Sequence, residues 1–331
     1  KNKKITVGSM FAGIGGIDLG FQQAGFNILW ANENDKNACL TYKKNFNHYL
    51  YQEDVHNLSP KKLPKVDIIT SGFPCQAFSL AGYRKGFNDD RGNLFFETLR
   101  FIKAIKPKVY FLENVKNLYG HDKGNTFKII RESLIDSGYS FITKIINTKD
   151  YSNIPQTRER VYILGFRGES DFNKLNNYDD KFISSRFKFP EKVPLKKKVY
   201  QLLEKNVENS KYYYDSTFMK GKLFHLLENE INDPKAIYQW RRQYVRKNKQ
   251  NLCPTLTANM GMGGHNVPII LDDRGIRKLL PKECAALQGF PKKFKFPEHL
   301  PDSQIYKQIG NSVTVKVVRN IAGQIMKVLD T

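Results

Sequence analysis

The sequence predicts an α/β fold with a doubly wound, mostly parallel sheet and a second, smaller and irregular domain. In the first half of the chain, short apolar runs alternate with segments that carry apolar residues at helical spacing. This alternation is typical of a parallel sheet with helices on both faces. After residue 167 the alternation stops, and the chain is rich in Lys, Asn and Tyr up to about residue 275. We therefore expect a first domain over residues 1–167, a second over 168–275, and a return segment over 276–331 that completes the first.

Each expected element has a local reason. The helix over 94–105 has apolar residues at helical spacing and stops before Pro107, which cannot continue a helix. The last helix, 312–329, places apolar side chains such as Val317 and Ile321 on one face, so we expect that face to pack on the first domain. The expected strands are 5–11, 27–32, 66–71, 109–112, 141–146 and 161–166, and the other helices are 17–24, 35–46, 126–137 and 281–287.

Composition restricts the class of partner. The chain has 331 residues, 40% of them hydrophobic, and a formal net charge of +22. A charge this large favours a polyanion such as nucleic acid as the partner. No apolar run reaches the length of a membrane span, and the first residues do not have the pattern expected of a secretory leader. The four cysteines are far apart and the six histidines lack metal-ligand spacing, which predicts a reduced, cytoplasmic protein without a bound metal.

Cys75 is the first candidate for chemistry. It follows Pro74 just after an apolar run that reads as a strand, so a stiffened turn would present its thiol. Glu113 takes a similar place after the next strand, and ligands of such sheets bind at the carboxyl ends of strands. A thiol and a carboxylate placed in this way can attack a ring carbon and hold a ring nitrogen. The alternative reading of Cys75 is a small buried hydrophobe.

The turn after the first strand suggests a nucleoside site. Glycines in the stretch that begins at Phe11 would let the backbone approach a ligand. The third glycine of a dinucleotide fingerprint would fall on Asp18, which argues against a bound pyrophosphate. Glu33 is placed to accept hydrogen bonds from ribose hydroxyls, and Asp54 to accept one from an exocyclic amine. These groups suit S-adenosylmethionine, although both carboxylates also read as ordinary solvated side chains.

Two arginines precede the 161–166 strand. Alternation along an extended segment would put Arg158 and Arg160 on the same face. Their guanidinium groups suit a base carbonyl, a phosphate, or the surroundings of the Cys75 thiolate, whose pKa they would lower. An arginine pair tied to carboxylates within the sheet is the equal alternative.

Taken together, the chain resembles the DNA cytosine-5 methyltransferases of bacterial restriction–modification systems. The resemblance covers almost the whole length, and the Pro-Cys-Gln, Glu-Asn-Val and Gln-x-Arg-x-Arg set in this order is highly specific. The matching residues are Phe11-Ala12-Gly13-x-Gly15-Gly16, Glu33, Asp54, Gly72-Phe73-Pro74-Cys75-Gln76, Glu113-Asn114-Val115, Gln156-x-Arg158-x-Arg160, Arg277-x-Leu279-x-Pro281-x-Glu283-Cys284, Leu287-Gln288-Gly289-Phe290-Pro291 and Gly310-Asn311-Ser312-Val313.

The resemblance implies a Rossmann-like methyltransferase fold and a covalent mechanism. The Cys75 thiolate would add to C6 of a flipped-out cytosine, and C5 would then take a methyl group from S-adenosylmethionine. Glu113 would hold the base at N3 and the exocyclic amine, Arg160 would contact its O2 side, and Arg158 would assist near the cysteine. The implied partner is double-stranded DNA, read at a short specific sequence, with a restriction endonuclease acting separately and the enzyme itself a monomer.

The resemblance also assigns the remaining site residues. The 168–275 region would be the target-recognition domain, where residues 238–247 interleave basic and aromatic groups. The cofactor pocket would comprise Phe11, Gly13, Ile14, Gly15, Glu33, Asn34, Asp54, Val55, Pro74, Leu94, Asn311 and Ser312. The DNA contacts would comprise Gln76, Ser79, Arg91, Arg241, Arg242, Thr255, Leu256, Gly263 and Gly264.

Four residues depart from the family's usual pattern. Asn34 stands where an aromatic or apolar residue is frequent, Glu53 where glycine is common, and Lys282 and Ala286 where arginines are often seen. None of them is a chemical residue. Two alternative functions are a tRNA cytosine-5 methyltransferase, which the long basic variable domain disfavours, and a non-catalytic DNA-binding regulator, which the intact Cys75 disfavours.

Overall fold

The structure, a computed structural model, describes residues 4–74, 94–168, 186–217, 222–241, 243–262 and 266–329. The chain divides into two compact units. Unit 1 comprises residues 1–146, 159–191 and 318–331, and unit 2 comprises residues 147–158 and 192–317. Each unit is described by itself below.

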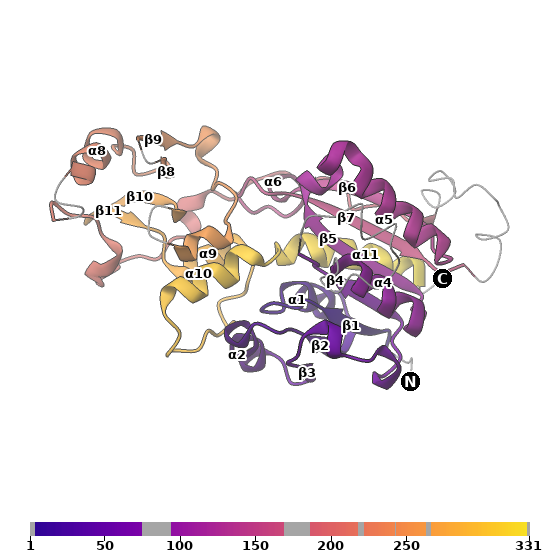
Figure 1. The fold of residues 1–331 in the computed structure, drawn as a ribbon. Coiled ribbons are helices and arrows are strands. Elements are labelled where there is room, and N and C mark those ends of the chain that lie inside the picture. The colour runs from indigo at the N-terminus through magenta and orange to yellow at the C-terminus, as the bar shows by residue number, and fades with distance from the viewer. Residues whose placement is uncertain are drawn as a thin grey trace. The chain divides into compact units, whose positions relative to one another are not determined.

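Unit 1 is built on a mostly parallel sheet with the strand order β3-β2-β1-β4-β5-β7-β6 (Figure 1). Strands β1 to β5 pair in parallel with their neighbours, and β7 runs antiparallel to β5. This arrangement confirms the predicted α/β class with a mostly parallel sheet. The strands are β1 Thr6–Met10, β2 Asn27–Asn32, β3 Tyr49–Tyr51, β4 Ile68–Ser71, β5 Val109–Val115, β6 Ile142–Asn147 and β7 Glu159–Phe166.

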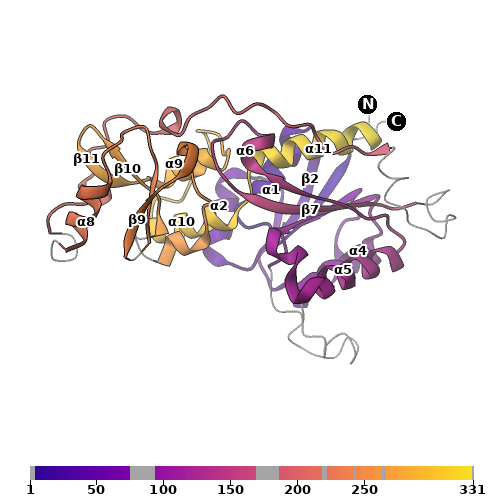
Figure 2. The ribbon, with the colours of Figure 1, turned by 90° about the horizontal axis from the view of Figure 1, so that it is seen from above.

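Helices cover both faces of this sheet, as Figure 2 shows from above. Successive side chains of β5 point to opposite faces of the sheet, because side chains alternate along a strand. Tyr110 lies in the core cluster with residues of α4 and α5, whereas Phe111 stacks edge-on against Phe21 of α1. The helices with residues in this unit are α1 Gly16–Gln23, α2 Lys36–Asn45, α4 Leu94–Ile105, α5 Asn125–Asp136 and most of α11 Val315–Leu329.

Local sequence accounts for the element boundaries. The Asp35 side chain caps α2 by accepting a hydrogen bond from the Ala38 N–H at 2.9 Å. The apolar face of α11 reaches unit 1, where Val318 lies so close to Gly20 that a Cβ at residue 20 would be 2.7 Å from it. Strand β5 is longer than the sequence predicted, because Glu113 is still paired in register with Tyr162 of β7.

Unit 2 contains a second sheet with the strand order β11-β10-β8-β9. Its core gathers Leu227, Ile231, Tyr238, Val245 and Ile269. The sequence predicts few regular elements here, because strands of four residues are too short for a clear period. The elements are α6 Thr148–Tyr151, α8 Lys222–Glu230, β8 Tyr238–Arg241, β9 Tyr244–Lys247, β10 Ile269–Asp272, β11 Gly275–Lys278, α9 Pro281–Leu287 and α10 Asp302–Asn311.

The two units divide the chain differently from the boundaries expected from sequence. Residues 276–317 belong to unit 2, and only residues from 318 onward join unit 1. Residues 147–158 also belong to unit 2. The reason is a buried polar network that joins residues 147–158 to residues 253–315, which the next subsection describes.

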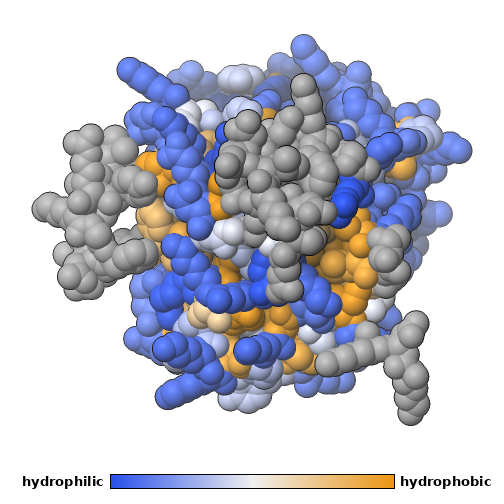
Figure 3. Space-filling view, turned by 90° about the vertical axis from the view of Figure 1, so that its right-hand side faces the viewer, coloured by the Kyte–Doolittle hydropathy of each residue, from blue (hydrophilic) through white to orange (hydrophobic). Residues whose placement is uncertain are grey.

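Hydrophilic residues surround smaller hydrophobic areas on the face of the molecule seen in Figure 3. Within the part of the chain that the structure describes, no helix is both long and apolar enough to cross a membrane.

Candidate active site

Glu113 and Arg160 form an ion pair near the carboxyl end of β5. Arg160 Nε lies 3.3 Å from Glu113 Oε1, and the two side chains are only 14% and 10% exposed. The antiparallel register of β5 and β7 sets this pair, because it places Arg160 opposite Val115, two residues beyond Glu113. A carboxylate and a guanidinium at one strand end can together hold a polar ring through a donor and an acceptor.

The chain that leads to Cys75 runs beside this pair. Asn114 donates a hydrogen bond from Nδ2 to the Phe73 carbonyl at 2.8 Å, and Phe73 is buried. A Cβ at Gly72 would lie 3.7 Å from Glu113 Oε2. Residues 72 and 73 are thus fixed against β5, with Pro74 exposed at the end of the described stretch. The predicted residues Cys75, Gln76, Ser79 and Arg91 lie outside the described residues.

The glycine-containing turn after β1 is tied to Glu33. Glu33 Oε2 accepts a hydrogen bond from the Gly13 N–H at 2.7 Å, and Oε1 accepts from the N–H groups of Asn34 and Asp35. Gly13 and Gly15 have φ angles of 57° and 87°, which favour glycine. A Cβ at Gly13 would meet nothing within 4 Å, so open space lies beside the turn. Phe11 borders it with a φ of 52°, and Ile14 is buried beneath it.

Asp54 lies at the start of a short 3-10 helix, Val55–Asn57. Its Oδ1 accepts a hydrogen bond from the His56 N–H at 2.9 Å, and this bond holds the pKa of Asp54 below its usual range. The carboxyl group therefore stays charged and can accept further hydrogen bonds. Val55 is buried, and Leu94 begins α4 at the edge of the same core cluster.

A buried polar chain supports the glycine turn from below. The Tyr42 hydroxyl donates to Asp18 Oδ2 at 2.5 Å and lies 2.6 Å from His48 Nε2. Asp18 is 1% exposed, and burial raises its pKa from 3.8 to about 6. Burial lowers the pKa of His48 to about 4. Only glycine fits at position 15, because a Cβ there would lie 2.2 Å from the Phe46 ring.

Arg158 is a buried residue whose described hydrogen bonds go to backbone carbonyls. Nη1 donates to the Leu256 carbonyl at 2.6 Å, and Nη2 donates to the carbonyls of Gly310, at 3.2 Å, and Ser312. Arg158 is 2% exposed. Alternation predicts that Arg158 and Arg160 share a face, but their partners differ: Arg160 contacts a carboxylate and Arg158 contacts main-chain oxygens.

Gln156 opens the Gln-x-Arg-x-Arg motif, but no role was assigned to it from the sequence. Its Nε2 donates to the Leu287 carbonyl at 2.6 Å, and its Oε1 accepts from the Leu256 N–H at 3.2 Å. Gln288 extends the network, since it accepts a hydrogen bond from Thr314 at 3.2 Å. The signal for Gln156 in the sequence was its place at the start of the Gln-x-Arg-x-Arg motif, and the structure shows that it is fully buried. This is the buried network that joins residues 147–158 to the rest of unit 2.

The predicted cofactor and DNA residues of unit 2 flank this network. Asn311 is exposed, Ser312 is half-buried, and both follow Gly310 at the end of α10. Thr255 donates a hydrogen bond to the Thr157 carbonyl at 2.7 Å, whereas the Leu256 side chain is 1% exposed and faces the interior. Arg242, Gly263 and Gly264 lie outside the described residues.

Strands β8 and β9 form a ribbon at the edge of the second sheet. Cross-strand pairs place Gln239 opposite Arg246 and Arg241 opposite Tyr244 on one face. Arg241 and Tyr244 are exposed, and Arg246 donates a hydrogen bond to Gln239 Oε1. Within the described residues, no carboxylate forms an ion pair with either arginine. The opposite face is apolar, since Tyr238 and Val245 are buried there.

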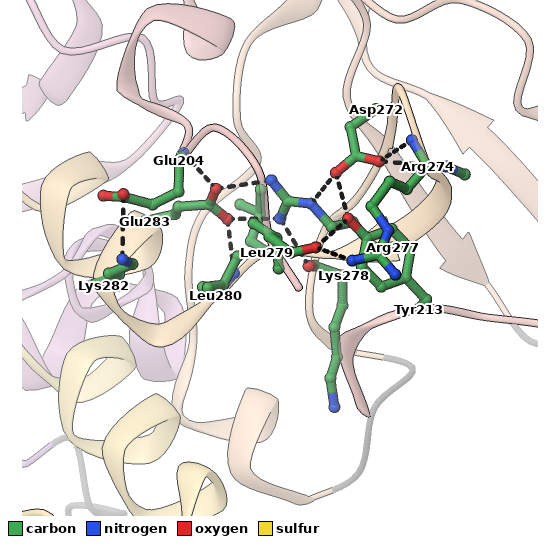
Figure 4. Close-up of polar contacts among 12 residues, drawn as sticks. Glu204, Tyr213, Asp272, Arg274, Arg277, Lys278, Leu279, Leu280, Lys282 and Glu283 are labelled. Atoms are coloured by element: carbon green, nitrogen blue, oxygen red, sulfur yellow. Dashed lines mark hydrogen bonds and ion pairs between the residues drawn. The ribbon is translucent and has the colours of Figure 1, made fainter. Parts of the chain in front are cut away.

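The sheet that carries this ribbon is anchored by a buried charge network around Arg277 (Figure 4). Arg277 is 0% exposed, and its guanidinium donates two hydrogen bonds of 2.9 Å to Glu283 and one of 2.6 Å to Asp272. Lys282 stays outside this network and pairs with Glu204 at 3.1 Å near the surface. The Lys282 ammonium group, at a departure from the family pattern, therefore pairs outside the cluster of Arg277, Glu283 and Asp272.

The described cysteines are poor nucleophiles. Cys39, Cys253 and Cys284 are free and 0% exposed. Burial raises the pKa of each of the three thiols, so little thiolate forms at neutral pH.

The chain thus combines a mostly parallel α/β sheet with a carboxylate–arginine pair at the carboxyl end of β5. The model of the C-5 cytosine-specific DNA methylase family matches residues 5–327, so the chain belongs to this family of methyltransferases. The family and the class of enzyme predicted from the sequence are thereby confirmed.

Individual relatives match nearly the whole chain. The type II methyltransferase M.Bsp6I of Bacillus sp. (strain RFL6) is 50% identical over 325 residues, which are 98% of this chain and 99% of the relative. M.SsoII of Shigella sonnei is 38% identical and covers 100% of this chain, which in turn spans 82% of that protein. The S. pombe Dnmt2 methyltransferase is similar in fold, with a TM-score of 0.75 at 21% identity over 99% of this chain and 100% of that chain.

Proposed function

We propose that this protein transfers a methyl group from S-adenosylmethionine to C5 of a flipped-out cytosine within a short specific sequence of duplex DNA. The observation that carries the proposal is the Glu113–Arg160 pair at the carboxyl end of β5, beside residues 72–74, in a member of the C-5 cytosine-specific DNA methylase family. The pair supplies an acceptor and a donor for one polar edge of a pyrimidine.

Cys75 is the proposed nucleophile. The three described cysteines are excluded by burial, and Cys75 follows the segment that packs against Glu113. Its thiolate adds to C6 of cytosine, forming a C–S bond and shifting electron density to C5. C5 then takes the methyl group as the methyl–sulfur bond of the donor breaks and a neutral thioether leaves. A base removes the C5 proton, and the C6–S bond breaks to restore the thiolate and the aromatic ring.

Glu113 and Arg160 hold the cytosine during this reaction. Glu113 accepts from the exocyclic amine and shares a proton at N3, which stabilises the charge that develops as the thiolate adds. Arg160 donates to O2, and its guanidinium keeps Glu113 oriented. A stacked base cannot reach these groups, so the cytosine leaves the helix.

The glycine turn of unit 1 fits a nucleoside. Gly13 faces open space and so leaves room for a ligand, and Glu33 already organises the turn through its carboxylate. Glu33 and Asp54 would accept hydrogen bonds from the ribose hydroxyls and the adenine amine, with Asn311 and Ser312 also assigned to the cofactor. When bound, the sulfonium of S-adenosylmethionine supplies an electrophilic methyl group.

The ribbon of β8 and β9 is the proposed DNA face. A two-stranded ribbon fits the major groove, and this one presents Arg241, Tyr244 and Arg246 on its exposed face. Lys247 belongs to the other face, opposite Tyr238, and pairs with Asp233 at 2.7 Å. The net charge of +22 supplies further phosphate contacts.

Two experiments test the proposal. Bisulfite sequencing of DNA from cells that express the chain should reveal one methylated sequence, and Cys75→Ala should abolish that methylation while sequence-specific DNA binding survives. A duplex with 5-fluorocytosine at the target should trap a covalent adduct that depends on Cys75. Equal methyl transfer by Cys75→Ala would refute the nucleophile, and transfer to tRNA in place of DNA in parallel assays would favour an RNA substrate.

A further inference from the structure

Arg158 joins two segments that are far apart in the sequence. Its Nη1 donates to the carbonyl of Leu256, and its Nη2 donates to the carbonyls of Gly310 and Ser312. The side chain is 2% exposed, so these charge-assisted bonds lie in a medium of low dielectric constant. A planar guanidinium reaches several acceptors at fixed angles, which the ammonium group of lysine does not.

Other contacts hold the same two segments together. A Cβ at Gly310 would lie 2.1 Å from the carbonyl carbon of Thr257, so the two backbones touch directly. Gln156 accepts a hydrogen bond from the Leu256 N–H, and Gln288 Nε2 donates to the Ile309 carbonyl at 3.1 Å. Residues 255–258 and 310–312 therefore form one block inside unit 2.

We infer that Arg158 is a positioning residue that couples the DNA-binding segment at Thr255–Leu256 to the cofactor-binding turn at Asn311–Ser312. The inference rests on the proposed function, which assigns these two segments to DNA and to S-adenosylmethionine. A ligand that orders one segment orders the other through the Arg158 guanidinium. Each ligand then raises the affinity for the other by the same factor, because such coupling is reciprocal.

Binding measurements on Arg158→Lys test this coupling. The dissociation constant of S-adenosylhomocysteine is measured with and without a duplex that carries the methylated sequence. In the wild-type protein the duplex should lower it by about five-fold or more, a usual size for coupling between sites. In Arg158→Lys the ratio should fall well below the wild-type value, because only the backbone contact and the glutamine hydrogen bonds still join the two segments, while the constant without DNA changes by less than about three-fold. Thr157→Ala is the matched control, because its side chain is exposed and its described contacts use the backbone.

Hydrogen exchange of the wild-type protein tests the same coupling and does not depend on whether Arg158→Lys folds. S-adenosylhomocysteine alone, without DNA, should slow hydrogen exchange of the amides of residues 256–260. Unchanged exchange there, or wild-type coupling in Arg158→Lys, would overturn the inference while leaving the proposed function intact. Failure of the wild-type protein to bind S-adenosylhomocysteine or to methylate DNA would instead overturn the proposed function itself.

Discussion

Replacing Glu283 by glutamine should destabilise unit 2 and leave unit 1 nearly unchanged. Glu283 accepts four described hydrogen bonds, two of 2.9 Å from Arg277, one of 2.7 Å from the Leu280 N–H and one of 2.8 Å from the Glu204 N–H. Glutamine keeps one acceptor oxygen and turns a donor amide toward groups that are themselves donors. Breaking a buried ion pair in this way typically costs about 3–5 kcal/mol. We expect about 3 kcal/mol, because Asp272 still pairs with Arg277.

Hydrogen exchange resolves the two units separately. The Tyr214 N–H, which donates to the Ile276 carbonyl at 2.9 Å, is a suitable reporter within unit 2, and the amides of β5 report on unit 1. Lys282→Ala is the matched control: its ion pair with Glu204 is largely exposed, so the loss should stay below about 1 kcal/mol. A loss below about 1 kcal/mol at Tyr214 in Glu283→Gln would refute the reasoning, as would an equal loss in β5.

Three further predictions follow from the site. Glu113→Gln should lower kcat for methyl transfer at least about 100-fold, because the carboxylate acts directly on the base. A kcat within about three-fold of wild type would contradict its role. Arg241→Ala should weaken DNA binding equally for specific and unrelated duplexes, and it should reduce the slope of log affinity against log salt by about one, as expected for one lost phosphate contact. A loss of affinity confined to the specific duplex would instead show that Arg241 reads a base. Asp18→Asn should gain about 2 kcal/mol of stability relative to wild type between pH 4.5 and pH 7.5, in denaturant titrations at each pH. The sign follows because burial raises the pKa of Asp18 in the folded protein from 3.8 to about 6. The protonated carboxyl group therefore stabilises the fold at low pH, and this contribution is lost as the pH rises through the folded pKa. A stability difference between Asp18→Asn and wild type that does not change with pH would show that Asp18 is not desolvated.

Most of unit 1 was predictable from the sequence because its elements are long or strongly periodic. The helix α4 begins and ends where its spacing and Pro107 predicted, and β2 also has the predicted bounds. Parallel strands that are buried on both faces read as apolar runs, which makes them easy to find. The short strands of unit 2 carry no such pattern, and α10, with charged and polar residues on much of its surface, escaped prediction.

The site residues also differ in whether the sequence alone could predict their roles. Glu113 was identified because a predicted strand leads into it, whereas Arg160 was assigned to the base through the family resemblance, and its pairing with Glu113 came only from the structure. The role of Arg158 could not follow from spacing, because its partners are carbonyl groups roughly 100 and 150 residues further along the chain. The same holds for Gln156, since a buried amide is understood only once its donors and acceptors are placed.

By itself the sequence determined the family, the α/β class of fold and the candidate chemical residues, since these depend on motif order and on hydrophobic periodicity, both local properties of the chain. Only the tertiary structure decided that residues 147–158 and 276–317 belong to one unit, because buried hydrogen bonds between distant segments leave no periodic trace in the sequence. It also decided that Arg158 contacts main-chain carbonyls while Arg160 pairs with Glu113, because two arginines with the same spacing and chemistry are distinguished only by what packs around them.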